Sequence, residues 1–243
     1  DPRGAAQHAR DLEAWEATGS LDAVKPYVIK PIFGCEVYFT PDDTLARDRK
    51  PDLYHMILIA TNETGYVNLM QTVSEAAVEG YYRPRVTLDN LRRHSEGLIA
   101  TSACLSGIVM KNLDRGNPAE ALRWAETFRD LFEPGNFYIE IQDHGITTEN
   151  GNTEEQINRQ LIEIARQVGV KVIATNDFHY LTREDAPVQD IMMCIGMNSK
   201  VDDPNRMRMQ GSEFYMKTED EMRALFPYCP EACDNTVELA EKC

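Results

Sequence analysis

Residues 170–180 read Val170-Lys171-Val172-Ile173-Ala174-Thr175-Asn176-Asp177-Phe178-His179-Tyr180. The first five residues form a short apolar run, which is typical of a buried strand in an α/β protein. Asp177 and His179 follow it two positions apart, so on an extended backbone both side chains point to the same side. A carboxylate and an imidazole at a strand end suit a divalent cation such as zinc or manganese. The alternative is a turn residue followed by a buried, hydrogen-bonded histidine.

Four further strands are predicted from runs of the same kind, at residues 32–39, 55–60, 97–100 and 137–141. Amphipathic helices are expected between them, because apolar residues recur at helical spacing within 66–73 and 157–168. This alternation predicts an α/β architecture with parallel strands. In a strand–loop–helix barrel the side chains at the carboxyl ends of the strands converge on one face. Polar residues just past each strand are therefore the site candidates.

Local sequence also marks helix starts. Asn117-Pro118-Ala119-Glu120 has a capping-box pattern with proline at the first helical position, and Thr218-Glu219-Asp220-Glu221 opens a further capped helix. Residues 5–18 and the segment from residue 230 onward are also expected to be helical, and residues 202–208 are expected to form a loop.

The composition limits the partners. The chain has 25 basic and 40 acidic residues and a net charge of -15, and such a surface repels nucleic acid phosphates unless basic clusters or cations intervene. A free-standing DNA-binding module is disfavoured, whereas a metal-dependent phosphoesterase, whose cations supply a positive field, is compatible. No apolar run approaches the roughly 18 residues of a membrane helix, so no membrane partner is expected. The six cysteines are scattered, which favours reduced thiols in a cytoplasmic protein.

Two titratable side chains interrupt apolar strands. Glu36 lies within Gly34-Cys35-Glu36-Val37-Tyr38, and a carboxylate buried there without a partner would be costly. It therefore either faces water on an edge strand or meets a cation. His55 stands at the start of the next strand, where a histidine is either a core or rim residue or a ligand.

Other candidates follow the strands at 97–100 and 137–141. Cys104 falls at a strand-to-helix turn, where the helix N-terminus would stabilise a thiolate that could bind zinc. A small buried residue at a tight turn is the alternative. Asp143 and His144 lie at a strand exit, where Glu140 and Gln142 alternate with apolar neighbours. They could line the mouth of a site or be ordinary turn residues.

The order and surroundings of these segments carry a resemblance. The segments are Lys30-Pro31-Ile32-Phe33-Gly34-Cys35-Glu36-Val37-Tyr38, Tyr54-His55, Gly65-Tyr66-Val67-Asn68-Leu69, Tyr81-Tyr82-Arg83-Pro84-Arg85, residues 97–107, residues 139–145 and Thr175-Asn176-Asp177-Phe178-His179-Tyr180. From about Lys30 to its last residue, the chain resembles the PHP (polymerase and histidinol phosphatase) domain of the alpha subunits of bacterial DNA polymerase III.

The resemblance implies a distorted (β/α)7 barrel that holds up to three divalent metal ions, usually zinc or manganese, at the carboxyl ends of its strands. The positions that match the family's metal ligands are Glu36, His55, Cys104, Asp177 and His179. Of these, Asp177, His179 and Glu36 are the implied catalytic residues. Asp143 and His144 match a family motif near the site.

The chain departs from the family pattern at its start. Such domains begin with a His-x-His strand and a Thr-Asp-His-Gly motif, and the sequence has neither. The chain also begins without methionine and stops inside a helical pattern, so we expect an excerpt whose N-terminal strands and several ligands are missing. The expected parts are a helical segment at 1–29, a partial, open barrel at 30–215 and helices leading toward a polymerase core at 216–243.

Three functions remain open at this point. The domain could be a metal-dependent 3′–5′ exonuclease within a DNA-directed DNA polymerase, with DNA and other replisome subunits as partners. It could be a metal-stabilised scaffold that binds those subunits without catalysis. It could also be a stand-alone phosphatase of the histidinol-phosphatase type. Nucleotide addition needs a separate carboxylate site for magnesium, which the resemblance places outside this chain.

Overall fold

The computed structural model describes residues 10, 13, 17–18, 30–41, 52–80 and 83–243. The chain forms two compact units, Asp1–Pro31 and Ile32–Cys243. The helix predicted at 5–18 falls mostly outside the described residues; the described ones, Arg10, Glu13, Ala17 and Thr18, are helical. The domain boundaries expected after residues 29 and 215 stay predictions.

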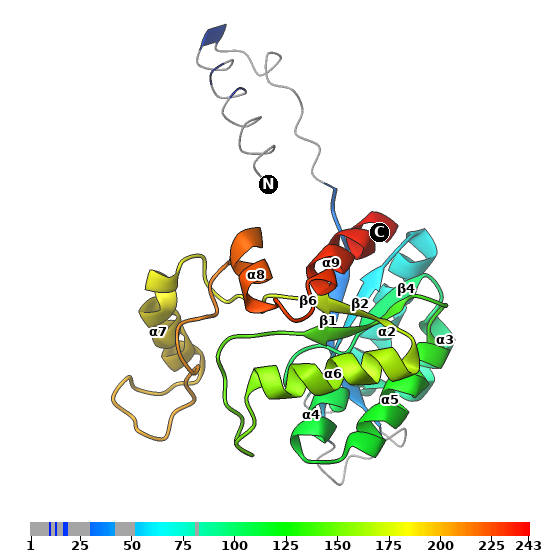
Figure 1. Ribbon diagram of the computed structural model, residues 1–243, viewed down its shortest axis with the longest axis horizontal. Coiled ribbons are helices and arrows are strands. Elements are labelled where there is room, and N and C mark those ends of the chain that lie inside the picture. The colour runs from blue at the N-terminus through cyan, green and yellow to red at the C-terminus, as the bar shows by residue number, and fades with distance from the viewer. Residues whose placement is uncertain (1–9, 11–12, 14–16, 19–29, 42–51, 81–82) are drawn as a thin grey trace. The chain divides into compact units, whose positions relative to one another are not determined.

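The second unit is built on one sheet whose six described strands lie in the order β3-β1-β2-β4-β5-β6 (Figure 1). The strands are β1 (Gly34–Thr40), β2 (Tyr54–Ala60), β3 (Val86–Thr87), β4 (Leu98–Thr101), β5 (Phe137–Ile141) and β6 (Lys171–Ala174). The helices are α2 (Glu63–Glu79), α3 (Leu88–His94), α4 (Ile108–Asp114), α5 (Pro118–Leu131), α6 (Glu154–Val168), α7 (Ala186–Gly196), α8 (Glu219–Leu225) and α9 (Glu231–Lys242), with a 3-10 turn η2 (Arg183–Asp185). Within the described residues the sheet is unclosed, which is consistent with a distorted, open barrel.

Strand direction differs from the expected parallel sheet. β4, β5 and β6 run parallel, and so do β1 and β3. β2, however, is antiparallel to both of its neighbours, β1 and β4. The five predicted strands all exist, but short apolar runs carry no signal for direction. The prediction of a parallel sheet is therefore wrong at β2.

The two faces of the sheet are covered differently. Alternate residues of β4, β5 and β6, such as Ala100, Ile139 and Val172, join the main core with residues of α2 to α6. The residues between them face the other way, because side chains alternate along a strand. Here Ile99 and Tyr138 join a small cluster with Leu239 of α9. One face is therefore covered by α2 to α6, and the opposite face contacts α9 through this small cluster.

Local sequence sets several helix ends. Thr153 and Thr218 cap α6 and α8, and both capping boxes are complete. The capping box predicted at Asn117 is wrong, because Asn117 makes no side-chain cap hydrogen bond. Glu120 pairs instead with Arg123, one turn along the helix.

The described helices include none that is both long and apolar enough to pass through a lipid bilayer. All six cysteines lie in the described part of the chain, and each is a free thiol.

Candidate metal centre

One cavity of about 470 Å³ gathers the candidate ligands from four strands. Its walls include all five positions that match the metal ligands implied by the resemblance: Glu36, His55, Cys104, Asp177 and His179. Gln142 and His144 also line it, together with residues 207–210 of the segment after α7. Candidate ligands that are up to 143 positions apart in the chain thus share one cavity.

Strand alternation places Glu36 and His55 on the face of the sheet opposite to the main core. Val37 packs into the helix-covered core, so Glu36 beside it points the other way. Tyr54 and Met56 pack into the same core, so His55 between them also points away from the helices. The cavity therefore lies on the face of the sheet opposite to the main core, where Gln189 and Met193 of α7 line it.

The antiparallel direction of β2 explains how His55 reaches the site. His55 is the second residue of β2, and the start of an antiparallel strand lies beside the end of its neighbour. Its backbone N–H donates to the carbonyl oxygen of Ser106, in the turn after β4, at 3.0 Å. In a parallel sheet the same residue would lie at the far edge. The unexpected strand direction is thus what brings His55 next to Cys104.

Glu36, His55 and Cys104 form the first group of contacts. His55 Nδ1 lies 3.3 Å from Glu36 Oε1 and 3.4 Å from Cys104 Sγ. The Glu36 side chain is half exposed, and β1 has no described neighbour beside Glu36 other than β2. The interpretation that Glu36 faces water on an open strand side is therefore compatible with its place in the cavity wall.

Cys104 is a protonated thiol in this environment. Burial raises its pKa to about 11, and the carboxylates of Asp177 and Glu36 act in the same direction. The turn that holds it ends at Gly107, the N-cap of α4. Desolvation is therefore the largest effect on the pKa of this thiol in the metal-free protein, and stabilisation of a thiolate by the helix N-terminus stays a prediction. Binding a cation at this sulfur would release a proton.

Asp177 and His179 form the second group. Their side chains lie 3.4 Å apart, from His179 Nε2 to Asp177 Oδ1, and both are about 40% exposed. The backbone N–H of His179 donates to the Phe214 carbonyl oxygen at 2.8 Å. The Phe214 ring meets the His179 ring edge-on, with centroids 5.7 Å apart. The segment after β6 is thus fixed to the chain near residue 214.

Asp143 and His144, the two candidates at the exit of β5, lie in different places. His144 is buried, lines the cavity and stacks on Phe214 with ring centroids 4.5 Å apart. Asp143 does not line this cavity; its Oδ1 accepts a hydrogen bond from the Gly145 backbone N–H at 3.0 Å. Asp143 lies instead in a shallow pocket with Arg159, so the structure brings only His144 to the site.

A buried carboxyl group lies behind the cavity. Glu140 of β5 is buried and accepts hydrogen bonds from the hydroxyl groups of Thr101 and Thr175. Gln142 Nε2 donates to it at 3.0 Å. Burial raises the pKa of Glu140 despite these hydrogen bonds, and the charge of Asp177 adds to the effect. This group ties the ends of β4, β5 and β6 together under the cavity.

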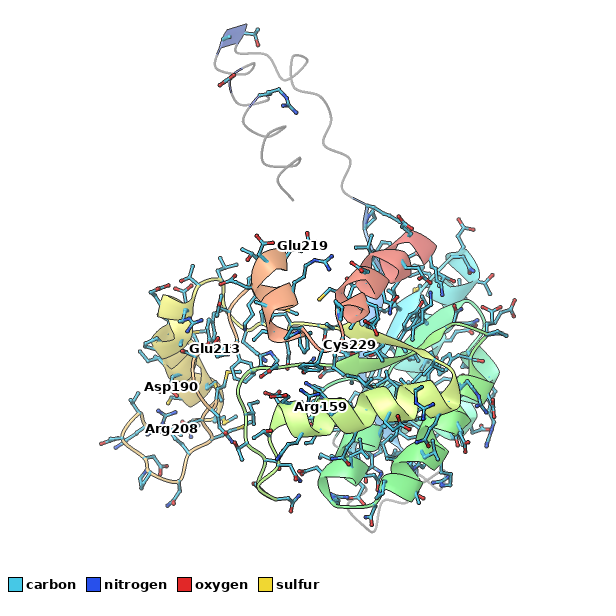
Figure 2. The ribbon with its side chains drawn as sticks, in the orientation of Figure 1. Arg159, Asp190, Arg208, Glu213, Glu219 and Cys229 are labelled. Carbon is cyan, nitrogen blue, oxygen red and sulfur yellow. The ribbon has the colours of Figure 1, made fainter. Side chains whose placement is uncertain are left out.

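Sequence reasoning missed several cavity residues. Arg208 belongs to the predicted loop, and Figure 2 shows it on the same side of the unit as Asp190 of α7. Glu154, the first residue of α6, is buried beside His144. Phe214 contacts both His144 and His179. A loop position or the first turn of a helix gives no local signal for such contacts.

The donor set fits a divalent cation in its chemistry. Two imidazoles, two carboxylates and one thiol are ligands that zinc accepts. His144 Nε2 is a buried nitrogen without a hydrogen-bond partner among the described residues, which also points to a bound group. In the same part of the chain, however, no three His, Cys, Asp or Glu side chains are grouped closely enough to hold an ion as they stand. Glu36 and Cys104 both contact the same nitrogen of His55, so these ligands would have to reorient around an ion.

The chain is similar to a known protein family. The family model described as PHP domain matches residues 7–144, more than half of the chain. The chain therefore belongs to the PHP domain family, whose members are generally metal-dependent. The matched region contains Glu36, His55 and Cys104, whereas Asp177 and His179 lie beyond it.

Individual relatives extend the similarity beyond the matched region. The chain is 42% identical over 219 residues to DNA polymerase III subunit alpha of Treponema pallidum and 43% identical over 221 residues to that of Borreliella burgdorferi. It is 39% identical over 226 residues to that of Thermus aquaticus. Each match covers 88% of this chain but only 18% or 19% of the relative. The chain thus spans about a fifth of the length of the curated relatives that it matches.

Proposed function

We propose that this chain is the PHP part of a DNA polymerase III alpha subunit, and that its cavity is a metal-dependent phosphoesterase site. The observation that carries this proposal is the convergence of the five candidate ligands on one cavity. The names of the relatives support the polymerase context over a stand-alone phosphatase. The substrate would be the 3′ end of a DNA strand, and the reaction the hydrolysis of its terminal phosphodiester.

The side chains have distinct tasks in this proposal. Zinc or manganese, when bound, would supply Lewis-acid stabilisation of the scissile phosphate and lower the pKa of water. Glu36, Asp177 and His179 would hold the cations, and His55 and Cys104 would complete the ligand set. Arg208 in the cavity wall would bind a phosphate oxygen of the strand.

The wider context is also part of the proposal. In the whole protein, nucleotide addition would use a magnesium site outside this chain. DNA and other replisome subunits would be its partners, in the cytoplasm. The net charge of -15 supports a role in which cations and other parts of the protein, rather than this surface, attract the DNA.

The test is 3′ shortening of a 5′-labelled single-stranded oligonucleotide by the purified chain with manganese or zinc. We expect Asp177→Ala to lower the rate at least about 100-fold, because it removes a ligand of the cations that stabilise the transition state. The matched control is Asp130→Ala, since Asp130 is exposed, pairs with Arg129 and does not line the cavity. Equal cleavage by Asp177→Ala and the unaltered chain would reject the proposed site.

A metal-stabilised scaffold is the second candidate. The observation that favours it is that the described ligands are paired with one another rather than grouped around a common position. In that case, chelation would lower the melting temperature while the oligonucleotide stays intact in every metal tested. Metal-dependent shortening that Asp177→Ala abolishes would exclude the scaffold as the whole function.

A further inference from the structure

His144 and Glu154 form a buried pair that the proposed ligand set does not use. The His144 residue is 3% exposed and Glu154 is 1% exposed. His144 lies just after β5, and Glu154 begins α6. A buried histidine and a buried carboxylate are costly to desolvate unless their polar atoms are satisfied. Each polar atom of the pair therefore needs a partner.

Glu154 is held in a fixed orientation by the backbone. Its Oε2 accepts two backbone N–H groups, from His144 at 2.7 Å and from Ile146 at 2.9 Å. Its Oε1 lies 3.4 Å from His144 Nδ1. Because a carboxylate only accepts hydrogen bonds, it favours the ring form in which Nδ1 carries the proton. The other ring nitrogen, Nε2, then has an unshared electron pair.

The Nε2 atom of His144 is unusual because it is a buried polar atom without a partner in the described residues. Leaving such an atom unsatisfied costs about 1–3 kcal/mol. The ring cannot turn freely to find another partner, because it stacks on Phe214 at an interplanar angle of 6°. The same Phe214 ring contacts His179, so one aromatic residue contacts both histidines.

The surroundings indicate what Nε2 binds. His144 lines the same cavity as Glu36, His55, Cys104, Asp177 and His179. An imidazole that gives its other N–H to a carboxylate is the usual arrangement of a metal-bound histidine, because the carboxylate fixes the ring and raises its basicity. We propose that His144 is a further metal ligand of this cavity, through Nε2, and that Glu154 is its positioning residue. This inference rests on the proposed function, since it needs the cavity to hold a cation.

The chain offers a matched control for this pair. His94 also lies beside a carboxylate, with Nε2 3.1 Å from Glu75 Oε1. That pair joins α3 to α2, and neither residue lines the cavity. Replacing His94 removes the same chemical group from a histidine–carboxylate pair without touching the proposed ligands.

The test is zinc affinity of the whole 243-residue chain, measured by titration calorimetry with zinc alone. We expect His144→Gln to lower the affinity at least about tenfold and Glu154→Gln to lower it about 10-fold to 100-fold, as for other groups that orient ligands. His94→Gln should bind zinc as the unaltered chain does. Unchanged zinc affinity in His144→Gln, together with a loss in Asp177→Ala, would overturn the role of His144 alone. An unaltered chain that binds no zinc would overturn the proposed function as well.

A measurement without substitution covers the case in which these variants do not fold. The chain has five histidines, so nitrogen-15 spectra can resolve their rings. Sequential backbone assignment distinguishes His144 from His179, because both rings contact Phe214. We expect Nδ1 to carry the proton in the metal-free protein and the Nε2 resonance to shift when zinc is added. A proton on Nε2, or an Nε2 resonance that stays unchanged while those of His55 and His179 shift, would contradict the proposal.

Discussion

At the scale of single residues, the cavity combines groups whose ionisation depends on one another. Cys104 is kept neutral by burial and by the carboxylates of Asp177 and Glu36, which raise its pKa. Burial also raises the pKa of Glu140, with Asp177 adding to the effect. A site that crowds acidic groups in this way lowers its own repulsion when a cation binds. The metal-free protein should therefore carry an electrostatic cost that metal binding relieves.

Glu140 gives a direct measure of that cost. Its folded pKa lies above the ordinary value of 4.5, so the folded state binds a proton more tightly than the unfolded state. The contribution of Glu140 to the free energy of unfolding is then fully present below pH 4.5. It is lost as pH rises through the folded pKa. We expect the stability of the unaltered chain relative to Glu140→Gln to fall by up to about 1.4 kcal/mol for each pH unit within that window.

The measurement is urea unfolding of both proteins between pH 4.5 and about 8 with a chelator present, because a bound cation would change the sign of the local field. A difference between the two free energies of unfolding that stays constant with pH would contradict the raised pKa of Glu140.

Local chemistry in the sequence was enough to select the five cavity residues as candidates, because each is a ligand-type side chain in or just after an apolar run. Glu154 could not be selected in this way. It lies in the first turn of a helix, where acidic residues are common on the surface, and only the tertiary contact with His144 distinguishes it. Asp143 was selected from the sequence but does not line the cavity, whereas its neighbour His144 does.

At the scale of elements, the fold depends on a close approach between α2 and the turn before β4. Asn62 caps α2 by accepting a hydrogen bond from the Gly65 backbone N–H at 2.9 Å. A Cβ at Gly65 would lie 1.8 Å from the carbonyl oxygen of Gly97. Backbone atoms cannot move aside as a flexible side chain can, so only glycine fits at position 65.

We therefore expect Gly65→Ala to destabilise the chain by about 3 kcal/mol or more, because the helix must shift away from the sheet. At Gly196, the last residue of α7, an added Cβ would have no other atom within 4 Å, and Gly196→Ala should be neutral or slightly stabilising. Urea unfolding of both variants decides the matter. A loss below about 1 kcal/mol in Gly65→Ala would show that the approach is not rigid.

The sequence predicted the positions of the strands well and their directions poorly. Apolar runs located β1, β2, β4, β5 and β6 within a few residues, because each strand has at least one buried face. The direction of β2 was not predictable, since pairing between distant segments decides it. The two-residue β3 is too short to leave a periodic pattern.

At the scale of the whole molecule, the cavity joins strands from the two halves of the sheet. Glu36 and His55 come from β1 and β2, whereas Asp177 and His179 follow β6. β1 and β2 are not adjacent to β6, because β4 and β5 lie between β2 and β6. A cation held by both groups would cross-link parts of the sheet that otherwise contact each other only through intervening strands, and it would bind only the folded state.

Metal removal should therefore destabilise the chain as a whole. A ligand that binds only the folded state adds about 2.7 kcal/mol at a free concentration about 100 times its dissociation constant. We expect the melting temperature measured with excess zinc to fall by several degrees when a chelator is added. The double variant Glu36→Gln/Asp177→Asn should show little change on chelation. An identical melting temperature for the unaltered chain with and without metal would contradict the cross-link.

The proposed function and the role of His144 both need divalent cations in the cavity that Glu36, His55 and Asp177 line. Diffraction from crystals of the chain grown with zinc, recorded at the zinc absorption edge, shows whether a cation binds there. Our prediction is a set of anomalous peaks within about 2.3 Å of donor atoms of Asp177, His179 and at least one of Glu36, His55 and Cys104. A cavity without such a peak, in crystals where zinc occupies other positions, would contradict it.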